Sequence, residues 1–474
     1  MRLFELLLIL INVPFFAWGF SSKPRPNWVR WLPLTAVPLL ILHLFIEGGR
    51  WQMFPAYGLT GLALLMVIWF SQSKQLAKSK RPFAKPKPKI MTILGLFLGI
   101  IFFTIAIGLP TLLPVPQLIP TTGSYSIGTT TVHLVDDSRP EIYTEDSADN
   151  REIMVQIWYP ADPSVTKPKA DYIEGLDVAG SVIAEQFDLP SFLFNHVNLT
   201  KLDIVQDAPL VADGQSFPII FFSHGLTGLR MQNTGMVREL ASHGYVVVAA
   251  DHTYGNALSV FPDGRVILYD PAIVFDDDST PPKTGNTLVG VWANDVGYIL
   301  DQLAEWHGEV GNRFNGRLDL TQVGIFGHST GGGTAVEFCM QDGRCTAGIG
   351  LDSWIEPVSD SIYETSLSQP FMFINSPAWL NDDNSQLGRI IFDNLSNDGY
   401  LLTLANTRHF DFTDLPLFSP LTPQLGLSGD IDSTTSLTIQ NEYILAFFDV
   451  YLKGADEGVL KRPSAYPELQ IERR

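Results

Sequence analysis

An uncharged apolar run of twenty residues, Ile90 to Leu109, constrains the first part of this chain more than any other feature. About 20 such residues cross the hydrocarbon core of a bilayer as a helix, which satisfies its own backbone hydrogen bonds there. Phe54 to Phe70 has the same character, and Leu32 to Ile46 and Leu6 to Phe20 are weaker stretches that contain proline. The pattern predicts a transmembrane region with about four helices in residues 1–118.

The first stretch, Leu6 to Phe20, also fits a secretory signal peptide. Arg2 precedes it, and Ala17-Trp18-Gly19 faintly matches the small-residue pattern of a cleavage site. Further apolar stretches follow at once, and this favours a helix that is retained. Whether the segment is cleaved stays open at this point.

The basic loops predict how these helices are oriented. Ser73 to Lys89 holds seven basic residues and no acidic one, and Ser22 to Arg30 holds three basic residues. Short loops rich in Lys and Arg face the cytoplasm. The N-terminus and everything after Leu113 then lie on the outer side. We therefore predict a multi-pass integral membrane protein whose extracytoplasmic domain comprises residues 119–474.

The second part of the chain is strongly acidic, with 19 Lys and Arg against 48 Asp and Glu in residues 121–474. Such a surface repels phosphates, which argues against a nucleic acid as partner. The two cysteines of the chain, Cys339 and Cys345, both lie in this part. They form a disulfide in an oxidising compartment or stay two buried thiols in a reducing one, and two isolated cysteines make a poor metal site.

Past residue 120 the long apolar stretches give way to short apolar runs that alternate with helical patterns. Continuous apolar runs are typical of parallel strands, because helices cover both faces of a parallel sheet. We expect strands at 218–223, 245–251, 322–327, 347–352, 370–375 and 400–405, with helices at 235–244, 287–306, 332–343 and 383–395. Alternating stretches at 125–136 and 152–160 predict an antiparallel start, and 437–454 a final helix. The order predicts an α/β domain with a mostly parallel, doubly wound sheet.

The stretch Val323 to Ala335 places a serine among glycines, between a predicted strand and a predicted helix. It lacks the Lys-Ser or Lys-Thr of a phosphate-binding loop and the glycine spacing of a dinucleotide site. Gly327-His328-Ser329-Thr330-Gly331 matches the Gly-x-Ser-x-Gly nucleophile elbow of the α/β-hydrolase fold, in which a strained turn exposes the serine hydroxyl. Ligands bind beyond the carboxyl ends of parallel strands, and Ser329 falls at such an end.

A serine nucleophile needs a histidine base, and the histidine needs a carboxylate that orients it. In this fold their order along the chain is serine, acid, histidine. His409 is the one histidine after Ser329, and it follows the predicted strand at 400–405. Asp352 ends the predicted strand at 347–352, so we select it as the acid. The other candidates lie in loops: Asp360, Asp382 and Asp383.

Two backbone N–H groups must hold the oxyanion of a tetrahedral intermediate. Thr330, directly after the nucleophile, supplies the first, and Leu226, in the loop after the predicted strand at 218–223, supplies the second. We expect His224 and His328 to brace these loops. No role is assigned to the other histidines of this part: His133, His196, His243, His252 and His307.

Together these motifs resemble the platelet-activating-factor acetylhydrolase family, calcium-independent phospholipases A2 of α/β-hydrolase fold, in a bacterial membrane-tethered form. The resemblance spans residues 123–455 and rests on four segments: Phe222 to Leu226, Gly327 to Gly332, Leu351 to Trp354 and His409 to Phe412. Ile157 to Pro160 is similar to the start of the domain in bacterial members. The family implies release of short or oxidised acyl chains from glycerophospholipids, with no metal and no cofactor.

We therefore expect a membrane-tethered serine carboxylic-ester hydrolase that acts on an ester or phospholipid. Trp354, beside the acid, is a candidate wall of the substrate pocket, with core packing as an equal alternative. A general carboxylesterase or polyesterase of the dienelactone-hydrolase-like group is the alternative enzyme. Two other classes stay open: a non-catalytic binding module of hydrolase fold, and a transporter, which only His43 within an apolar stretch supports. The sequence indicates no oligomeric state.

Overall fold

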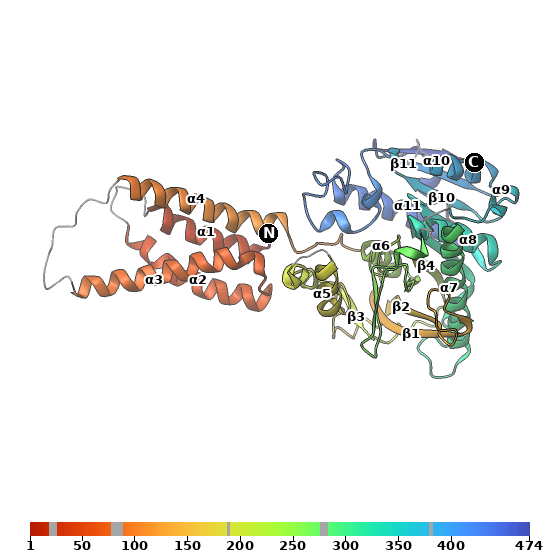
Figure 1. The fold of residues 1–474 in the computed structure, drawn as a ribbon, viewed down its shortest axis with the longest axis horizontal. Helices are drawn as coiled ribbons and strands as arrows, with labels where there is room; N and C mark the ends of the chain where they lie inside the picture. Colours follow the sequence, from red (N-terminus) through yellow and green to blue (C-terminus); the bar gives the residue numbers. More distant parts are fainter. Residues whose placement is uncertain (19–25, 77–88, 187–189, 275–282, 379–382) are drawn as a thin grey trace. The chain divides into compact units, whose positions relative to one another are not determined.

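The computed structural model describes residues 1–18, 26–76, 89–186, 190–274, 283–378 and 383–474. The chain divides into two compact units, both drawn in Figure 1. The helical unit comprises Met1–Pro116 with Gly180–Thr200 and Phe418–Pro420. The sheet unit comprises the remainder: Gln117–Ala179, Lys201–Leu417 and Leu421–Arg474.

Four long helices form the helical unit: α1 (Leu3–Ala17), α2 (Asn27–Ile46), α3 (Phe54–Leu76) and α4 (Lys89–Leu112). They cover the four apolar stretches, and α1 packs against α2 and α3 while α3 packs against α4 (Figure 1). Short 3-10 turns complete the unit: η2 (Trp51–Met53), η3 (Ser191–Phe194) and η4 (Val197–Leu199). Residues 19–25 and 77–88, which include much of both basic loops, lie outside the described residues.

The helical unit buries polar side chains and exposes apolar ones. Glu5, Asn12 and Thr60 are almost completely buried, and Asn12 Nδ2 donates to Thr60 Oγ1 over 2.8 Å. Large apolar side chains stand on the outer surface of all four helices, among them Phe45, which is 87% exposed. Apolar side chains also fill the space between the helices, so the unit is apolar inside and outside, whereas a helical bundle in water is apolar mainly on its inward stripe.

Among the described residues, one helical stretch, Trp51–Trp69, is long and apolar enough to cross a membrane. Shorter apolar helical stretches occupy Leu3–Ala17, Trp31–Ile46 and Leu96–Leu112. By length and composition the described residues thus support one crossing, where the sequence predicts about four.

A ten-stranded mixed sheet organises the sheet unit, in the order β12-β11-β10-β9-β8-β4-β5-β2-β1-β3. The antiparallel start consists of β1 (Ser126–Pro140) and β2 (Asn150–Ala161), and the edges are β3 (Ile204–Gln206) and β12 (Leu469–Arg473). Six consecutive strands run parallel: β4 (Phe217–Ser223), β5 (Val246–Asp251), β8 (Leu318–His328), β9 (Cys345–Leu351), β10 (Phe371–Asn375) and β11 (Gly399–Leu404). Each of these six was predicted, and all are confirmed to within a few residues.

Helices cover both faces of this sheet. On one face α7 (Lys283–Gly308) packs against α8 (Thr330–Gln341), and on the other α6 (Thr234–Ser242) packs against α11 (Ser433–Lys453). The final helix α11 ends as expected at Gly454, whose φ of 67° is left-handed. The smaller helical elements are α5 (Leu176–Gln186), η5 (Pro271–Ile273), α9 (Ser361–Glu364), α10 (Asp383–Asn394), η8 (Leu415–Leu417) and α12 (Gly458–Lys461).

Some elements of the sheet unit escape prediction. β3, β12 and the separate hairpin of β6 (Leu258–Val260) and β7 (Val266–Leu268) are three to five residues long and lack a sustained apolar pattern. Cys339 and Cys345 form a disulfide between the end of α8 and the start of β9, with Cα atoms 5.0 Å apart.

The strand order places a reversal between β4 and β8. From β4 the chain moves to β5 on one side, and from β8 it moves to β9 and onward on the other. The connections after β4 and β8 therefore leave the carboxyl ends of these strands in opposite directions along the sheet. Open α/β sheets bind their ligands at such a reversal, and the elbow at Ser329 follows β8.

Candidate active site

Ser329 occupies a strained turn between β8 and α8. Its φ of 55° lies in the left-handed region, which is costly for a residue with a side chain. A Cβ atom on Gly327 would lie 2.0 Å from the carbonyl oxygen of Gly331, and one on Gly331 would lie 2.0 Å from that of Ser223. The two glycines therefore let β8, α8 and the end of β4 approach each other, as in a nucleophile elbow.

Backbone hydrogen bonds tie Ser329 to the end of β9. Its N–H donates to the Leu351 carbonyl over 2.9 Å, and its own carbonyl accepts the Trp354 N–H over 2.8 Å. Asp352 lies between these two partners in the chain. The main chain thus fixes the predicted acid next to the predicted nucleophile.

Asp352 and His409 are hydrogen-bonded, with 2.9 Å between Asp352 Oδ2 and His409 Nδ1. Asp352 is completely buried, and its carboxylate also accepts from Ser376, over 2.7 Å from the N–H and 3.2 Å from the hydroxyl. A carboxylate only accepts, so Nδ1 of His409 carries the proton and Nε2 is the basic nitrogen. The His409 side chain is 30% exposed, which leaves the base accessible.

The turn that carries His409 is held by its neighbours. Within η7 (His409–Phe412), Asp411 Oδ2 accepts the Arg408 N–H over 2.7 Å and the Gly429 N–H over 2.6 Å. Asn233 Nδ2 donates to the Phe412 carbonyl over 2.7 Å. The short segment after β11 therefore has a defined conformation, although it belongs to no long helix or strand.

Gln232 and His328 link the loop after β4 to the histidine turn. Gln232 Oε1 accepts the Gly225 N–H over 3.3 Å, and Gln232 Nε2 donates to His328 Nδ1 over 3.1 Å. His328 Nε2 donates in turn to the His409 carbonyl over 3.0 Å. Burial lowers the pKa of His328 well below its ordinary value, so the ring stays neutral in this bridge. Sequence reasoning expected a bracing role for His328 but missed Gln232, which lies in no motif.

The loop after β4 lies against the nucleophile. A Cβ atom on Gly225 would lie 2.9 Å from His328 Nδ1 and 3.3 Å from Ser329 Cβ. Leu226 adjoins Gly225 in the chain, and Thr330 adjoins Ser329. Each residue predicted to hold an oxyanion is thus the chain neighbour of one of two residues, Gly225 and Ser329, that lie against each other.

Trp354 is partly exposed, and its Nε1 donates to Glu356 over 3.0 Å. Together with Leu226 it packs against a small buried cluster around Trp292. Other partly exposed side chains complete this apolar surface: Tyr143, Tyr254, Tyr269 and Val291. Leu226 belongs to the predicted oxyanion loop and Trp354 follows the predicted acid by two residues, so the surface adjoins the candidate site through these two side chains.

The remaining candidates take other places. Asp360 precedes α9, Asp383 begins α10, and Asp382 lies outside the described residues. Several histidines without a predicted role make local contacts: His133 with Glu152, His196 with the Leu193 carbonyl, His243 with Glu239, and His307 with the Leu318 N–H.

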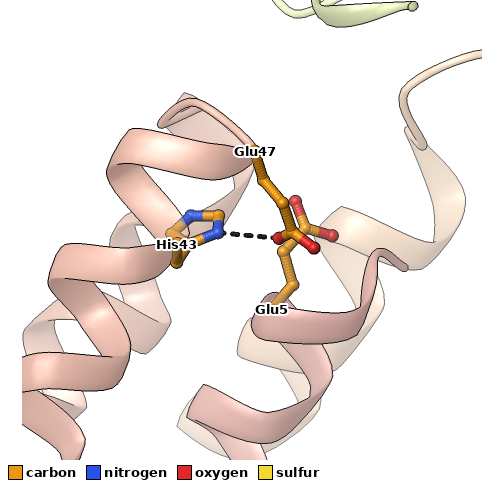
Figure 2. A group of neighbouring side chains, drawn as sticks. All are labelled: Glu5, His43 and Glu47. Atoms are coloured by element: carbon orange, nitrogen blue, oxygen red, sulfur yellow. Dashed lines mark hydrogen bonds and ion pairs between the residues drawn. The ribbon is translucent and has the colours of Figure 1, made fainter.

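One group of metal-ligating residue types lies in the helical unit. Figure 2 shows the His43 ring directed at Glu47, with Glu5 reaching toward them from α1, and their ligand atoms lie within 4.8 Å of one another. Both oxygens of Glu5 accept from Arg50, over 2.7 and 2.9 Å, and the Arg2 guanidinium adds two hydrogen bonds to Glu5, over 2.8 and 3.0 Å. Two guanidinium charges thus balance the two carboxylates, so the group fits a neutral interhelical network and not a cation site.

This chain matches one family model and several known proteins. The family model "Platelet-activating factor acetylhydrolase, isoform II" matches residues 115–261 and 302–458. Platelet-activating factor acetylhydrolase of Cavia porcellus is 25% identical over 331 residues, covering 64% of this chain and 73% of that protein. The protein of the same name from Canis lupus familiaris is 27% identical over 358 residues, covering 70% and 76%. A probable 1-alkyl-2-acetylglycerophosphocholine esterase of Arthroderma benhamiae is 26% identical over 273 residues, covering 54% and 66%.

A solved structure supports the same class of fold and chemistry. The ferulic acid esterase of Streptomyces cinnamoneus superposes with a TM-score of 0.62 at 26% identity, covering 75% of this chain and 99% of that one. The mixed sheet with flanking helices in this chain is of the α/β-hydrolase type. The family model covers more than half of the described chain and includes the elbow, the acid and the histidine. The chain therefore belongs to the platelet-activating factor acetylhydrolase, isoform II family and is a carboxylic ester hydrolase.

Proposed function

We propose that Ser329, His409 and Asp352 are the catalytic triad of this hydrolase. The observation that carries the proposal is the 2.9 Å hydrogen bond between buried Asp352 and the partly exposed His409, beside a serine in a left-handed turn. Few structural roles require a serine at positive φ, whereas a nucleophile elbow does.

In the proposed reaction Ser329 Oγ attacks the ester carbonyl carbon while Nε2 of His409 takes the hydroxyl proton. The carbonyl oxygen becomes an oxyanion, which the backbone N–H groups of Leu226 and Thr330 hold. Collapse breaks the bond to the alcohol, and the alcohol leaves with the proton from His409. A water molecule then attacks the acyl-enzyme with His409 as base, which releases the acid and restores Ser329. Asp352 keeps His409 in the required tautomer and stabilises its imidazolium form.

For the substrate we propose a glycerophospholipid with a short or oxidised acyl chain. The names of the relatives support an acetyl ester of a glycerophospholipid, and the apolar surface with Leu226 and Trp354 supports an acyl or alkyl chain beside the triad. The second candidate is a general carboxylesterase, which the likeness to a ferulic acid esterase favours. A non-catalytic module of the same fold would have no need of the ordered acid and histidine.

We further propose that residues 1–118 form a transmembrane region of about four helices and that residues 119–474 are the extracytoplasmic catalytic domain. The outward apolar side chains of the helical unit and the spanning stretch Trp51–Trp69 support a membrane anchor. The Cys339–Cys345 disulfide supports an oxidising compartment for the domain. A membrane tether would place the site near lipid substrates.

The test is a hydrolysis profile of the full chain purified in detergent. Wild type, Ser329→Ala and the control Ser242→Ala, a buried serine of α6, are assayed on p-nitrophenyl esters of increasing acyl length and on a phospholipid with a short acyl group. Preference for the phospholipid, lost in Ser329→Ala and kept in Ser242→Ala, is the expected result. Activity on simple esters alone would keep the triad and discard the lipid, and activity that survives Ser329→Ala would overturn the triad.

A further inference from the structure

A second serine, histidine and aspartate constellation lies inside the sheet unit. Ser223 Oγ is 3.1 Å from His252 Nε2, and His252 Nδ1 is 2.9 Å from Asp295 Oδ2. Ser223 ends β4, His252 follows the end of the neighbouring strand β5, and Asp295 comes from α7. All three side chains are completely buried, so no ester can reach Ser223 and the group is not a second hydrolytic site.

Asp295 is an ionised acceptor in this network. Arg151 donates to it over 2.8 Å, and Arg139 donates over 2.9 Å. Burial raises the pKa of Asp295, but the charge of Arg151 and the hydrogen bonds from His252 and Arg151 outweigh burial and hold that pKa well below its usual range. Arg151 in turn donates to Glu141 over 2.9 Å, so the buried charges are paired.

The ionised carboxylate fixes the protonation of the ring beside it. His252 must donate from Nδ1 to Asp295, and burial lowers the pKa of His252, so its Nε2 is unprotonated. Ser223 therefore donates its hydroxyl proton to His252. The His252 ring stacks on the Trp292 ring, with centroids 4.3 Å apart and an angle of 8° between the ring planes, and this contact fixes its orientation. The position of the Ser223 side chain is thus set by the network behind it.

The same turn also holds the residue after Ser223. The His252 N–H donates to His224 Nε2 over 3.2 Å, so His224 carries its proton on Nδ1 and donates it to the Gly225 carbonyl over 2.7 Å. Burial, together with His252, lowers the pKa of His224 to about 3, which keeps this ring neutral. Beyond it, the Thr227 N–H donates to the Gly255 carbonyl over 2.9 Å. His224 and Thr227, which lie on either side of Leu226, are therefore both hydrogen-bonded to the turn after β5.

We infer that Ser223, His252 and Asp295 form a positioning relay that sets the loop carrying the Leu226 N–H against Ser329. The inference rests on the proposed function, because it assigns the relay to the oxyanion loop of that site. A displacement of this loop by a fraction of an ångström weakens a hydrogen bond to the transition state while leaving the binding of the ground-state ester nearly unchanged. Ser223, His252 and Asp295 touch no substrate and are positioning residues.

The test compares Ser223→Ala with the control Ser242→Ala in the full chain. For Ser223→Ala we expect kcat to fall roughly tenfold while KM stays within about twofold of wild type. The reason is that the displaced loop weakens a hydrogen bond to the transition state and not to the bound ester. A short-chain trifluoromethyl ketone forms an oxyanion on Ser329, so its inhibition constant should rise by the same factor. The pH dependence of kcat/KM should stay unchanged, because the substitution leaves the hydrogen bond between Asp352 and His409 in place.

A second variant keeps the inference testable if Ser223→Ala does not fold. His252→Phe retains the stack on Trp292 but removes both ring hydrogen bonds, and it should show the same split between kcat and KM. In the double variant the effects should not add, because both changes break one relay. Wild-type kcat and inhibitor affinity in a folded Ser223→Ala or His252→Phe protein would overturn the relay. Activity that survives Ser329→Ala would instead overturn the proposed site, so the two failures are distinct.

Discussion

The imidazole of His328 donates from Nε2 to the carbonyl oxygen of His409 over 3.0 Å, and the two ring centroids lie 4.4 Å apart. The residue before the nucleophile thus holds the main chain of the proposed base. Gln232 extends the contact to the Gly225 N–H, so one bridge spans the oxyanion loop, the elbow and the histidine turn. We therefore expect the geometry of the proposed site to depend also on side chains that do not contact the ester.

Replacing His328 by phenylalanine tests this bridge. Phenylalanine fills a similar volume and keeps ring packing on His409, but it removes both hydrogen bonds. We expect kcat to fall about tenfold with little change in KM, because His409 loses its fixed position in the transition state. Steady-state kinetics on a short p-nitrophenyl ester measure both constants. A kcat within twofold of wild type in His328→Phe would show that the bridge has no catalytic role.

Asp352→Asn tests the proposed orientation of the base. Asparagine keeps the shape of the side chain, but its amide can donate to Nδ1 of His409 and thereby favour the wrong tautomer. In a serine protease the equivalent change lowers kcat by about 10⁴, and we expect a loss of the same order here. The neighbouring acid provides the control, because Asp360→Asn changes a loop residue outside the site and should leave kcat unaltered. Equal rates for the two variants would rule out Asp352 as the orienting acid.

Most of the fold of the sheet unit follows from its sequence. The six parallel strands are continuous apolar runs, and each is followed by a residue or motif that marks the strand end, as Asp352 does after β9. β3, β6, β7 and β12 were missed because three to five residues carry too little pattern to be distinguished from loops. For the helical unit the sequence predicts the helices, but the pairing of Arg50 with Glu5 depends on tertiary contact and leaves no local signal.

Residues of the proposed site could be predicted where they belong to a sequence motif. They could not be predicted where their role depends only on contacts with residues that are distant in the sequence. Ser329 and His409 are identified by the elbow and by chain order. Gln232 and His252 have no motif, since their partners lie at the ends of other strands or in other loops. His252 directly follows a parallel strand, β5, that neighbours β4. This position could have identified it, because Asp352 was selected for its position at the end of a predicted strand.

Arg50 holds three elements of the helical unit together. It donates to Glu5 from two nitrogens, over 2.7 and 2.9 Å, and to the carbonyls of Leu113 and Pro110 at the end of α4, over 2.5 and 3.1 Å. Arg50→Met leaves Glu5 buried with only Arg2 as a partner and leaves two helix-end carbonyls without a donor. We expect a loss of about 3 kcal/mol of stability, seen as a lower melting temperature in detergent. The double variant Glu5→Gln/Arg50→Met should recover part of the loss, and an unchanged melting temperature in Arg50→Met would contradict the assigned role.

Asp414 makes stability depend on pH in the direction opposite to most carboxylates. Burial raises its pKa to about 6, although Gly235 N–H and the Tyr172 hydroxyl donate to it over 3.0 and 2.9 Å. The folded state therefore holds this proton more tightly than the unfolded chain, so the contribution of Asp414 is present at low pH and is lost as pH rises from about 4 to about 6.

Asp414→Asn imitates the protonated carboxyl and cannot titrate. Relative to wild type, we expect the variant to gain up to about 3 kcal/mol between pH 4 and pH 7, as measured by chemical unfolding at both values. Other carboxylates titrate equally in both proteins, so their effects cancel in this difference. A difference that is independent of pH would mean that Asp414 is ionised in the folded protein throughout this range.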